Sequence, residues 1–206
     1  MTCRVVSISR SLGAGGEEIG RTVAKELGFR YADEEIITGA AEKAGVTPET
    51  VAQAEHTPSL IARILESIAR TPPSPEGWTG AAILPPNTSP DYESLIEKVV
   101  RETANEGNVV IVAHGASIPL GDLRGVLRVL VTGSPEVRAE RLAREAKLDE
   151  QAAKKAIDES DHQRREYLRR FYNVRQELPT HYDLVVNTDI LASPLAARLI
   201  AGAAKG

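Results

Sequence analysis

The sequence predicts an α/β fold, with a mainly parallel sheet of about five strands covered by helices on both faces. Two patterns predict it. Short apolar, β-branched runs, which are typical of strands buried on both faces, alternate with segments whose apolar residues recur at helical spacing. The chain has 206 residues, of which 42% are hydrophobic and 26% charged, enough for one sizeable core. We therefore expect a single domain over residues 1–206.

Five short runs have the composition of buried strands. They lie at residues 3–9, 29–31, 108–117, 125–133 and 181–188. Because helical segments separate most of these runs along the chain, we expect the strands to run parallel. Ligands of such sheets bind beyond the carboxyl ends of the strands, so the residues that follow each run are the first candidates for a binding site.

Helices are expected where apolar residues recur at helical spacing. These segments lie at residues 17–27, 33–44, 48–54, 59–69, 91–106, 134–148, 149–172 and 193–203. Gly28 is placed to end the first of them. Ser134 is a favourable N-cap, and Pro135 after it suits a first helical turn.

Residues 71–90, TPPSPEGWTGAAILPPNTSP, are too rich in proline for a regular helix or a central strand. Long irregular segments inside compact domains are often functional. We therefore expect a solvent-exposed flap. Its Trp78 either covers the domain surface or faces a substrate or a second subunit.

Composition excludes several classes of protein. The net charge of −4 argues against a protein that coats nucleic acid, so no nucleic-acid partner is expected. The single cysteine, Cys3, rules out a disulfide within the chain and suits a reducing compartment. No leader precedes the first strand and no apolar run is long enough to cross a bilayer. We expect a cytoplasmic monomer or homodimer without a membrane partner.

The turn after the first strand, SRSLGAGGEEIGR at residues 9–21, is glycine-rich. In the standard phosphate loop, GxxxxGK[ST], backbone N–H groups surround phosphate oxygens, the lysine neutralises charge and the hydroxyl meets magnesium. Gly15 occupies the last glycine position, and Arg10 stands at the first. Gly16 replaces the lysine and Glu17 the hydroxyl. The pattern alone leaves open both a phosphate loop and a plain structural turn.

A dinucleotide fingerprint is a second alternative. Gly13 and Gly15 open a helix, and Asp33 follows at the distance expected of a ribose-binding acid. The third glycine position is Glu18, whose bulk and charge oppose close approach of a pyrophosphate. A dinucleotide-dependent oxidoreductase is therefore the least favoured function.

A resemblance to a known family extends over nearly the whole chain. Its segments are VSISRSLGAGGEEIGRTVAKELGFRYADEEII, NVVIVAHGAS, GVLRVLVTGSPEVRAERL, the DxxRxxY pattern that starts at Asp161, and YDLVVNTDIL. Their order and spacing resemble the cytidylate kinase-like family, whose members are related to nucleoside monophosphate kinases and commonly carry a loop without lysine. The resemblance implies a three-layer P-loop kinase-like fold, with an acceptor-side insertion at residues 45–92 and a helical lid at 145–178.

The function implied by the resemblance is transfer of the γ-phosphate of ATP, with Mg²⁺, to a nucleoside monophosphate or another small acceptor. The implied catalytic residues are Arg10, Asp161 and Arg164. The implied nucleotide-binding residues are Ser11, Gly13, Ala14, Gly15, Gly16 and Glu17. The implied acceptor-binding residues are Asp33, His114 and Tyr167, although family members often have an arginine where this chain has His114.

Three points stay open in the sequence. Asp161 and Arg164 are three residues apart, so a simple ion pair on a helix surface is an alternative to catalytic roles. Asp33 either contacts the acceptor or caps a helix. No cluster of side chains predicts a dedicated metal site, so Mg²⁺ is expected to arrive with nucleotide phosphates.

Loss of the lysine makes a catalytically weak or inactive nucleotide-binding regulatory module the main alternative function. Glu17 and Glu18 also favour this alternative, because acidic side chains compete with phosphate for N–H groups at a helix start. On sequence alone, replacing Gly16 with Lys and Glu17 with Ser is expected to strengthen ATP binding about tenfold.

Overall fold

The computed structural model describes residues 3–45, 47–48, 90–112 and 115–206. It contains a 5-stranded sheet in the order β2-β3-β1-β4-β5, and every neighbouring pair is parallel. The strands are β1 (Val5–Arg10), β2 (Arg30–Ala32), β3 (Val109–Val112), β4 (Val126–Thr132) and β5 (Leu184–Asn187). The expected parallel α/β sheet is confirmed.

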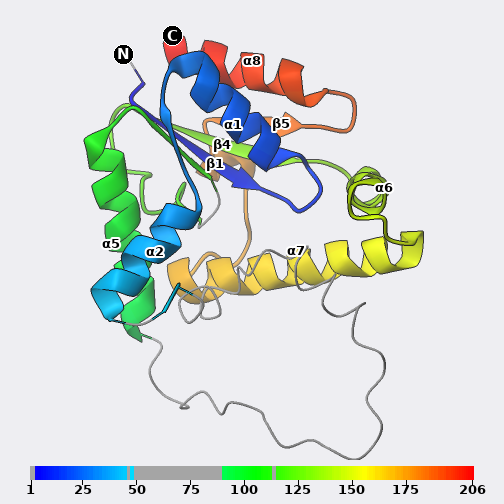
Figure 1. Ribbon diagram of the computed structural model, residues 1–206, viewed down its shortest axis with the longest axis horizontal. Helices are drawn as coiled ribbons and strands as arrows, with labels where there is room; N and C mark the ends of the chain where they lie inside the picture. The colour runs from blue at the N-terminus through cyan, green and yellow to red at the C-terminus, as the bar shows by residue number, and fades with distance from the viewer. Residues whose placement is uncertain (1–2, 46, 49–89, 113–114) are drawn as a thin grey trace, which may run out of the picture.

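The helices cover the sheet on both faces, and α1 and α8 lie together on one of them (Figure 1). The α-helices that the structure describes in full are α1 (Gly16–Leu27), α2 (Glu34–Ala44), α5 (Pro90–Glu106), α6 (Pro135–Ala146), α7 (Glu150–Tyr172) and α8 (Ser193–Lys205). A short 3₁₀ helix (Pro179–His181) precedes β5. Each agrees with the sequence pattern to within a few residues, except that β3 ends at Val112, earlier than expected.

Several expectations concern residues outside the described ranges. The helices expected near 48–54 and 59–69, the proline-rich flap with Trp78, and most of the 45–92 insertion are among them. They remain predictions.

β1 is the central strand, and its two faces belong to two different cores. Val6 and Ile8 are fully buried in the core formed with α1 and α8. Val5 points to the other face, in the core formed with α2 and α5. Ser7 and Ser9 share that second face and are also buried. Both hydrogen-bond to a buried hydroxyl, that of Ser117, at 3.1 and 3.2 Å. Polar groups therefore lie inside the molecule beneath the carboxyl end of β1.

Helices α6 and α7 pack on each other through a separate small core. It consists of Ala139, Leu142, Ala153, Ala156 and Ile157. Leu12, from the turn after β1, packs against the same core. Helices α6 and α7 thus pack against the glycine-rich turn as well as against each other.

Local sequence explains where α6 begins. Ser134 is its N-cap and accepts a hydrogen bond from the Val137 amide at 3.4 Å, with Pro135 in the first turn. Gly28, in the left-handed conformation with φ 68°, ends α1 as expected. None of the helices in the described ranges has both the length and the apolar character that a membrane-spanning segment needs.

Two helical glycines provide a test of this packing. A Cβ at Gly20 in α1 would lie 2.7 Å from Cγ2 of Val112, whereas a Cβ at Gly202 in α8 would meet nothing within 4 Å. We expect Gly20→Ala to lower the free energy of unfolding by about 1–3 kcal/mol through overpacking. The matched Gly202→Ala should raise it by about 0.5–1 kcal/mol by restricting the unfolded chain. Urea titrations measure both, and equal shifts would contradict the packing of α1 on β3.

Candidate functional site

The glycine-rich turn connects the carboxyl end of β1 to the start of α1. Gly13 and Gly15 have φ 74° and 76°, left-handed values that side chains disfavour, and Gly15 is the N-cap of α1. The first N–H groups of a helix have no partner within the helix and carry a partial positive charge. The turn therefore presents backbone donors at the carboxyl edge of the sheet, which is where an anion binds in many α/β proteins.

Side chains from neighbouring elements donate hydrogen bonds to the carbonyl groups of the turn. The carbonyl oxygens of residues 12–14 accept hydrogen bonds, in order, from Arg138 at 3.3 Å, Arg141 at 2.7 Å and Thr188 at 3.1 Å. These donors come from α6 and from the end of β5. The Ala14 N–H donates within the turn, to the carbonyl of Ser11 at 3.1 Å. With its carbonyls held in this way, the turn has a defined shape, and the N–H groups of Gly13 and of residues 15–17 are available to a ligand.

Arg10, the last residue of β1, lies across Gly16. A Cβ at Gly16 would be 2.6 Å from the Cβ and 2.9 Å from the Cδ of Arg10. The guanidinium then reaches Glu17, with 2.6 Å between Nη2 and Oε1. Its Nε is buried and has no hydrogen-bond partner among the described residues. Arg10 thus fills the space from which the lysine of a standard phosphate loop would extend.

This contact bears on one prediction from the sequence. The loop pattern predicts that Gly16→Lys together with Glu17→Ser strengthens ATP binding, but any side chain at position 16 would collide with the stem of Arg10. The collision involves atoms near the Arg10 backbone, which cannot easily move aside. A lysine fits at position 16 only if Arg10 is removed.

Asp161, on α7, is paired with Arg138 and not with Arg164. Arg138 donates from Nη1 and Nη2 to the two carboxylate oxygens of Asp161 at 2.9 and 2.7 Å, and from Nε to the carbonyl of Gly133. Arg138 is only 3% exposed. The helix-surface ion pair between Asp161 and Arg164 is therefore not formed, and Asp161 positions the arginine that holds the glycine-rich turn.

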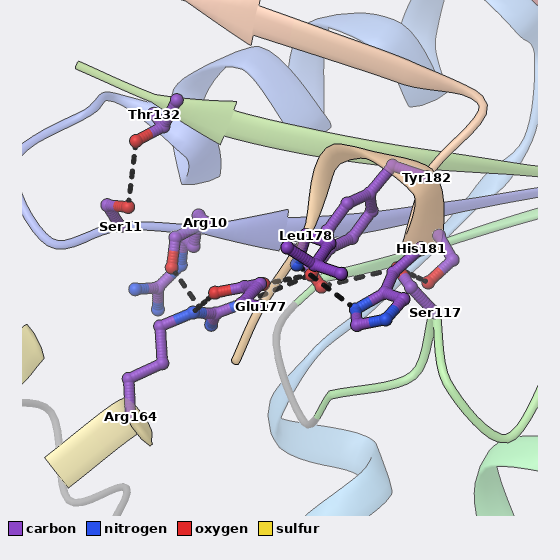
Figure 2. Close-up of polar contacts among 11 residues, drawn as sticks. Arg10, Ser11, Ser117, Thr132, Arg164, Glu177, Leu178, His181 and Tyr182 are labelled. Atoms are coloured by element: carbon purple, nitrogen blue, oxygen red, sulfur yellow. Dashed lines mark hydrogen bonds and ion pairs between the residues drawn. The ribbon is translucent and has the colours of Figure 1, made fainter. Parts of the chain in front are cut away.

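Arg164 reaches from α7 to the end of β1 (Figure 2). Its Nε and Nη2 donate to the carboxylate of Glu177 at 2.8 and 2.6 Å, and its Nη1 donates to the backbone carbonyl of Arg10 at 3.3 Å. Nη2 also lies 3.5 Å from the hydroxyl of Tyr182, which itself donates to Glu177. Most of the N–H groups of Arg164 are therefore already in use.

The environment of this cluster alters its titration. Burial alone would raise the pKa of Glu177, but the hydrogen bonds and charge of Arg164 outweigh it and lower that pKa. The pKa of Arg164 is raised by the same pairing, against the opposing effect of burial. Burial, followed by the charge of Glu177, raises the pKa of Tyr182 to about 12. The carboxylate and the guanidinium are both charged at neutral pH.

Of the three residues expected to bind the acceptor, the structure describes Tyr167 and Asp33. Tyr167 on α7 stacks on Phe171 with ring centroids 4.4 Å apart. It also packs over Gly115, where an added Cβ would lie 3.0 Å from a ring carbon of Tyr167. Asp33 follows β2 and accepts a hydrogen bond from the Tyr31 hydroxyl at 3.2 Å, but its side chain does not cap α2. His114 lies outside the described residues.

A pocket of about 300 Å³ opens beside the glycine-rich turn. Ser11 and Thr132, whose hydroxyls are 3.2 Å apart, line it at the ends of β1 and β4. Its other walls are α7 and the segment 173–178, which we name the strap. The lining includes four arginines and two carboxylates. Within the described ranges, no group of three or more His, Cys, Asp or Glu side chains is arranged to hold a metal ion.

The comparison with known families decides the affiliation. Residues 5–190 match the cytidylate kinase-like family. The chain belongs to this family. Among its relatives, the cytidylate kinase of Methanopyrus kandleri is 30% identical over 108 residues, which are 48% of this chain and 56% of that protein. The cytidylate kinase of Pyrobaculum arsenaticum is 30% identical over 113 residues, 54% of this chain and 60% of that protein. The match thus spans less than two thirds of either relative.

Solved structures support the fold of this cytidylate kinase-like protein. An uncharacterized protein from Eubacterium ventriosum has a TM-score of 0.66 and 15% identity, with 98% of each chain covered. A gluconokinase from Sinorhizobium meliloti has a TM-score of 0.54 and 14% identity, covering 97% of this chain and 90% of that one. A shikimate kinase from Bacteroides thetaiotaomicron has a TM-score of 0.50 and 14% identity, covering 97% of this chain and 95% of that one. The expected P-loop kinase-like fold is confirmed.

Sequence reasoning missed three residues that shape the site of this family member. Arg138 and Arg141 were not distinguished from the other arginines of α6 and α7, although their position in the helix after β4 was a usable signal. Glu177 had no signal at all, because it lies in an irregular segment and its partner is 13 residues away.

The Arg164–Glu177 pair predicts a dependence of stability on pH. The folded-state pKa of Glu177 is lowered, so the stabilisation is present above the ordinary glutamate pKa of about 4.3 and is lost as pH falls through the folded-state value. We expect Glu177→Gln to lower the free energy of unfolding by about 1–3 kcal/mol at pH 7, because Arg164 loses its counter-charge. Below about pH 4 the difference should shrink.

Urea titrations of both proteins between pH 3 and 7 measure this difference. Glu145→Gln is the matched control, since Glu145 is exposed on α6 and lies outside the pocket. A destabilisation by Glu177→Gln that does not vary with pH would contradict an ionised pair.

Proposed function

We propose that this cytidylate kinase-like protein transfers the γ-phosphate of ATP to a nucleoside monophosphate or another small acceptor. The observation that carries the proposal is the pre-shaped glycine-rich turn, with Arg10 in the space of the usual lysine. Phosphoryl transfer depends mainly on positioning and on neutralising charge. A turn with free N–H donors and an adjacent guanidinium supplies both.

The residues present suit the phosphates of ATP. The N–H groups within residues 13–17 would bind the β- and γ-phosphate oxygens, since they belong to a left-handed glycine turn and a helix start. The exception is Ala14, whose N–H donates to the carbonyl of Ser11. Arg10 would exchange Glu17 for phosphate, because a guanidinium pairs equally well with either anion. Magnesium would be held mainly by the phosphates and would neutralise the remaining charge.

The reaction needs little from the protein beyond these contacts. An oxygen of the acceptor attacks the γ-phosphorus, the bond from that phosphorus to the bridging oxygen breaks, and its electron pair stays on ADP. With a monophosphate acceptor the attacking oxygen is already anionic, so no general base is required. We assign Arg10 and Arg164 to neutralisation of charge, and Asp161 to holding Arg138.

The acceptor would lie on the side of the sheet formed by β2 and β3. Tyr167 and Asp33 are on that side, and His114 directly precedes Gly115 in the sequence. We propose that the 45–92 insertion covers the acceptor and that residues 145–178 act as the lid. The identity of the acceptor is set by these parts, and a nucleoside monophosphate is the first class to test.

A catalytically weak nucleotide-binding regulator is the second candidate. One observation favours it: Arg10 and Arg164 are each paired with a carboxylate, Glu17 and Glu177. Phosphates would have to displace these carboxylates, which lowers affinity and could prevent turnover. Family membership favours either candidate over a dinucleotide-dependent oxidoreductase.

Release of ADP from ATP, measured with a panel of nucleoside monophosphates and small hydroxyl compounds, separates these candidates. We expect turnover with at least one acceptor. Arg10→Ala should lower kcat by at least about tenfold, because removing a charge-stabilising donor from such a site costs about that much or more. Arg198→Ala, an exposed arginine on α8 away from the turn, is the control. Nucleotide binding without turnover on any acceptor would favour the regulator.

Variants of the turn test the role of Arg10 directly by calorimetric titration of ATP with Mg²⁺. Gly16→Lys alone should weaken binding and lower the melting temperature, because the new side chain collides with Arg10. Combining it with Arg10→Gly and Glu17→Ser removes the collision and installs the standard loop, and should restore affinity to the original value or better. If Gly16→Lys alone strengthens binding, Arg10 does not occupy the lysine's place.

A further inference from the structure

The pocket beside the glycine-rich turn carries more positive charge than its internal pairs neutralise. Of its four arginines, Arg138 is paired with Asp161 and Arg164 with Glu177. These two pairs account for both of the carboxylates in the lining. Two arginines therefore remain uncompensated inside a chain whose net charge is −4. An excess of positive charge in a pocket predicts an anionic ligand.

The uncompensated residues are Arg165 and Arg175. Neither is joined to a carboxylate by an ion pair in the part of the chain that the structure describes. Both are solvent-exposed, and they come from different walls of the pocket, α7 and the strap. An anion held by both would therefore connect the lid helix to the strap.

We propose that this pocket binds the dianionic phosphate group of a substrate, with Arg165 and Arg175 as its charged ligands. Two uncompensated guanidinium groups match the charge of a phosphate monoester, and the guanidinium fork suits phosphate oxygens. The hydroxyls of Ser11 and Thr132, which hydrogen-bond to each other, leave one O–H group to donate to the ligand on the sheet side. The inference rests on the proposed function only in taking the phosphate to belong to a nucleotide or to its acceptor.

The size and position of the pocket narrow the ligand. A volume of about 300 Å³ is at the lower end of small-molecule sites. It admits a phosphate group with part of its carrier and excludes two complete nucleotides. Because Ser11 is also the first residue of the glycine-rich turn, a phosphate here lies next to those bound by the turn.

This inference reverses what the DxxRxxY pattern suggests. The pattern contains Arg164, but Arg164 is only 20% exposed and its charge is engaged by Glu177. Its neighbour Arg165 is outside the pattern, lines the same pocket and has no carboxylate partner among the described residues, so it can pair with a ligand without first giving up a partner, as Arg164 must. Arg175 lies in an irregular segment that sequence patterns do not reach.

Calorimetric titration of the full chain with three probes, inorganic phosphate, CMP and an ATP analogue that is not hydrolysed, tests the proposal. Arg165→Gln and Arg175→Gln should each weaken binding of at least one probe about tenfold and reduce its dependence on salt. If the variants bind CMP more weakly, the pocket holds the acceptor phosphate. If they bind the ATP analogue more weakly, it holds a phosphate of the donor. Arg169→Gln is the matched control, since Arg169 is exposed on the same helix, pairs with Glu166 and does not line the pocket.

Unchanged affinities for all three probes in both variants would overturn the proposal, as would the absence of binding by the original protein at millimolar concentrations. Melting temperatures within about 2 °C of the original, expected for exposed substitutions, establish that the variants fold. ADP release keeps this inference separate from the proposed function. Binding that depends on Arg165 and Arg175, without turnover, supports the phosphate site in the pocket and refutes the proposed kinase activity. Turnover with unchanged affinities and KM in the variants supports the kinase activity and refutes the phosphate site.

Discussion

The contact of Arg10 with Gly16 is the constraint on which the rest of the site depends. Because the stem of Arg10 lies where a side chain at position 16 would begin, the chain holds one cation at this place, supplied by the end of β1 and not by the start of α1. Arg10 in this position requires glycine at position 16, so the absence of the lysine does not leave the turn without a neighbouring cation. The backbone turn is unaffected by this exchange, since its shape comes from Gly13 and Gly15 and from donors behind it.

Largely buried charge pairs connect this turn to α7. Arg138 binds the turn on one side and Asp161 of α7 on the other, and Arg164 ties α7 to the backbone of β1 and to Glu177. Leaving one partner of a buried pair unpaired is costly, so any movement of α7 relative to the turn would have to exchange these partners and not simply break the pairs. A phosphate is the natural exchange partner for either arginine. This coupling links occupation of the site to the position of α7.

Local patterns in the sequence were sufficient for the fold and insufficient for the site. The N-cap at Ser134 and the buried strands depend on neighbours in sequence, so they were predictable, whereas β3 ended early, at Val112. The DxxRxxY spacing showed which residues share a helix face, but it did not show which residues of other elements contact that face. The partner of Asp161 comes from 23 residues away and is an arginine that no pattern distinguished. The collision at Gly16 depends on the path of the Arg10 side chain, which is a property of the folded turn alone.

A crystal structure with a non-hydrolysed ATP analogue and Mg²⁺ tests the central claim most directly. The account predicts β- and γ-phosphate oxygens within hydrogen-bond distance of the N–H groups of Gly13 and of residues 15–17. It also predicts that the Arg10 guanidinium turns from Glu17 onto the phosphates. Phosphates bound elsewhere, or bound at the turn while Arg10 stays on Glu17, would contradict the claim that Arg10 takes the place of the lysine.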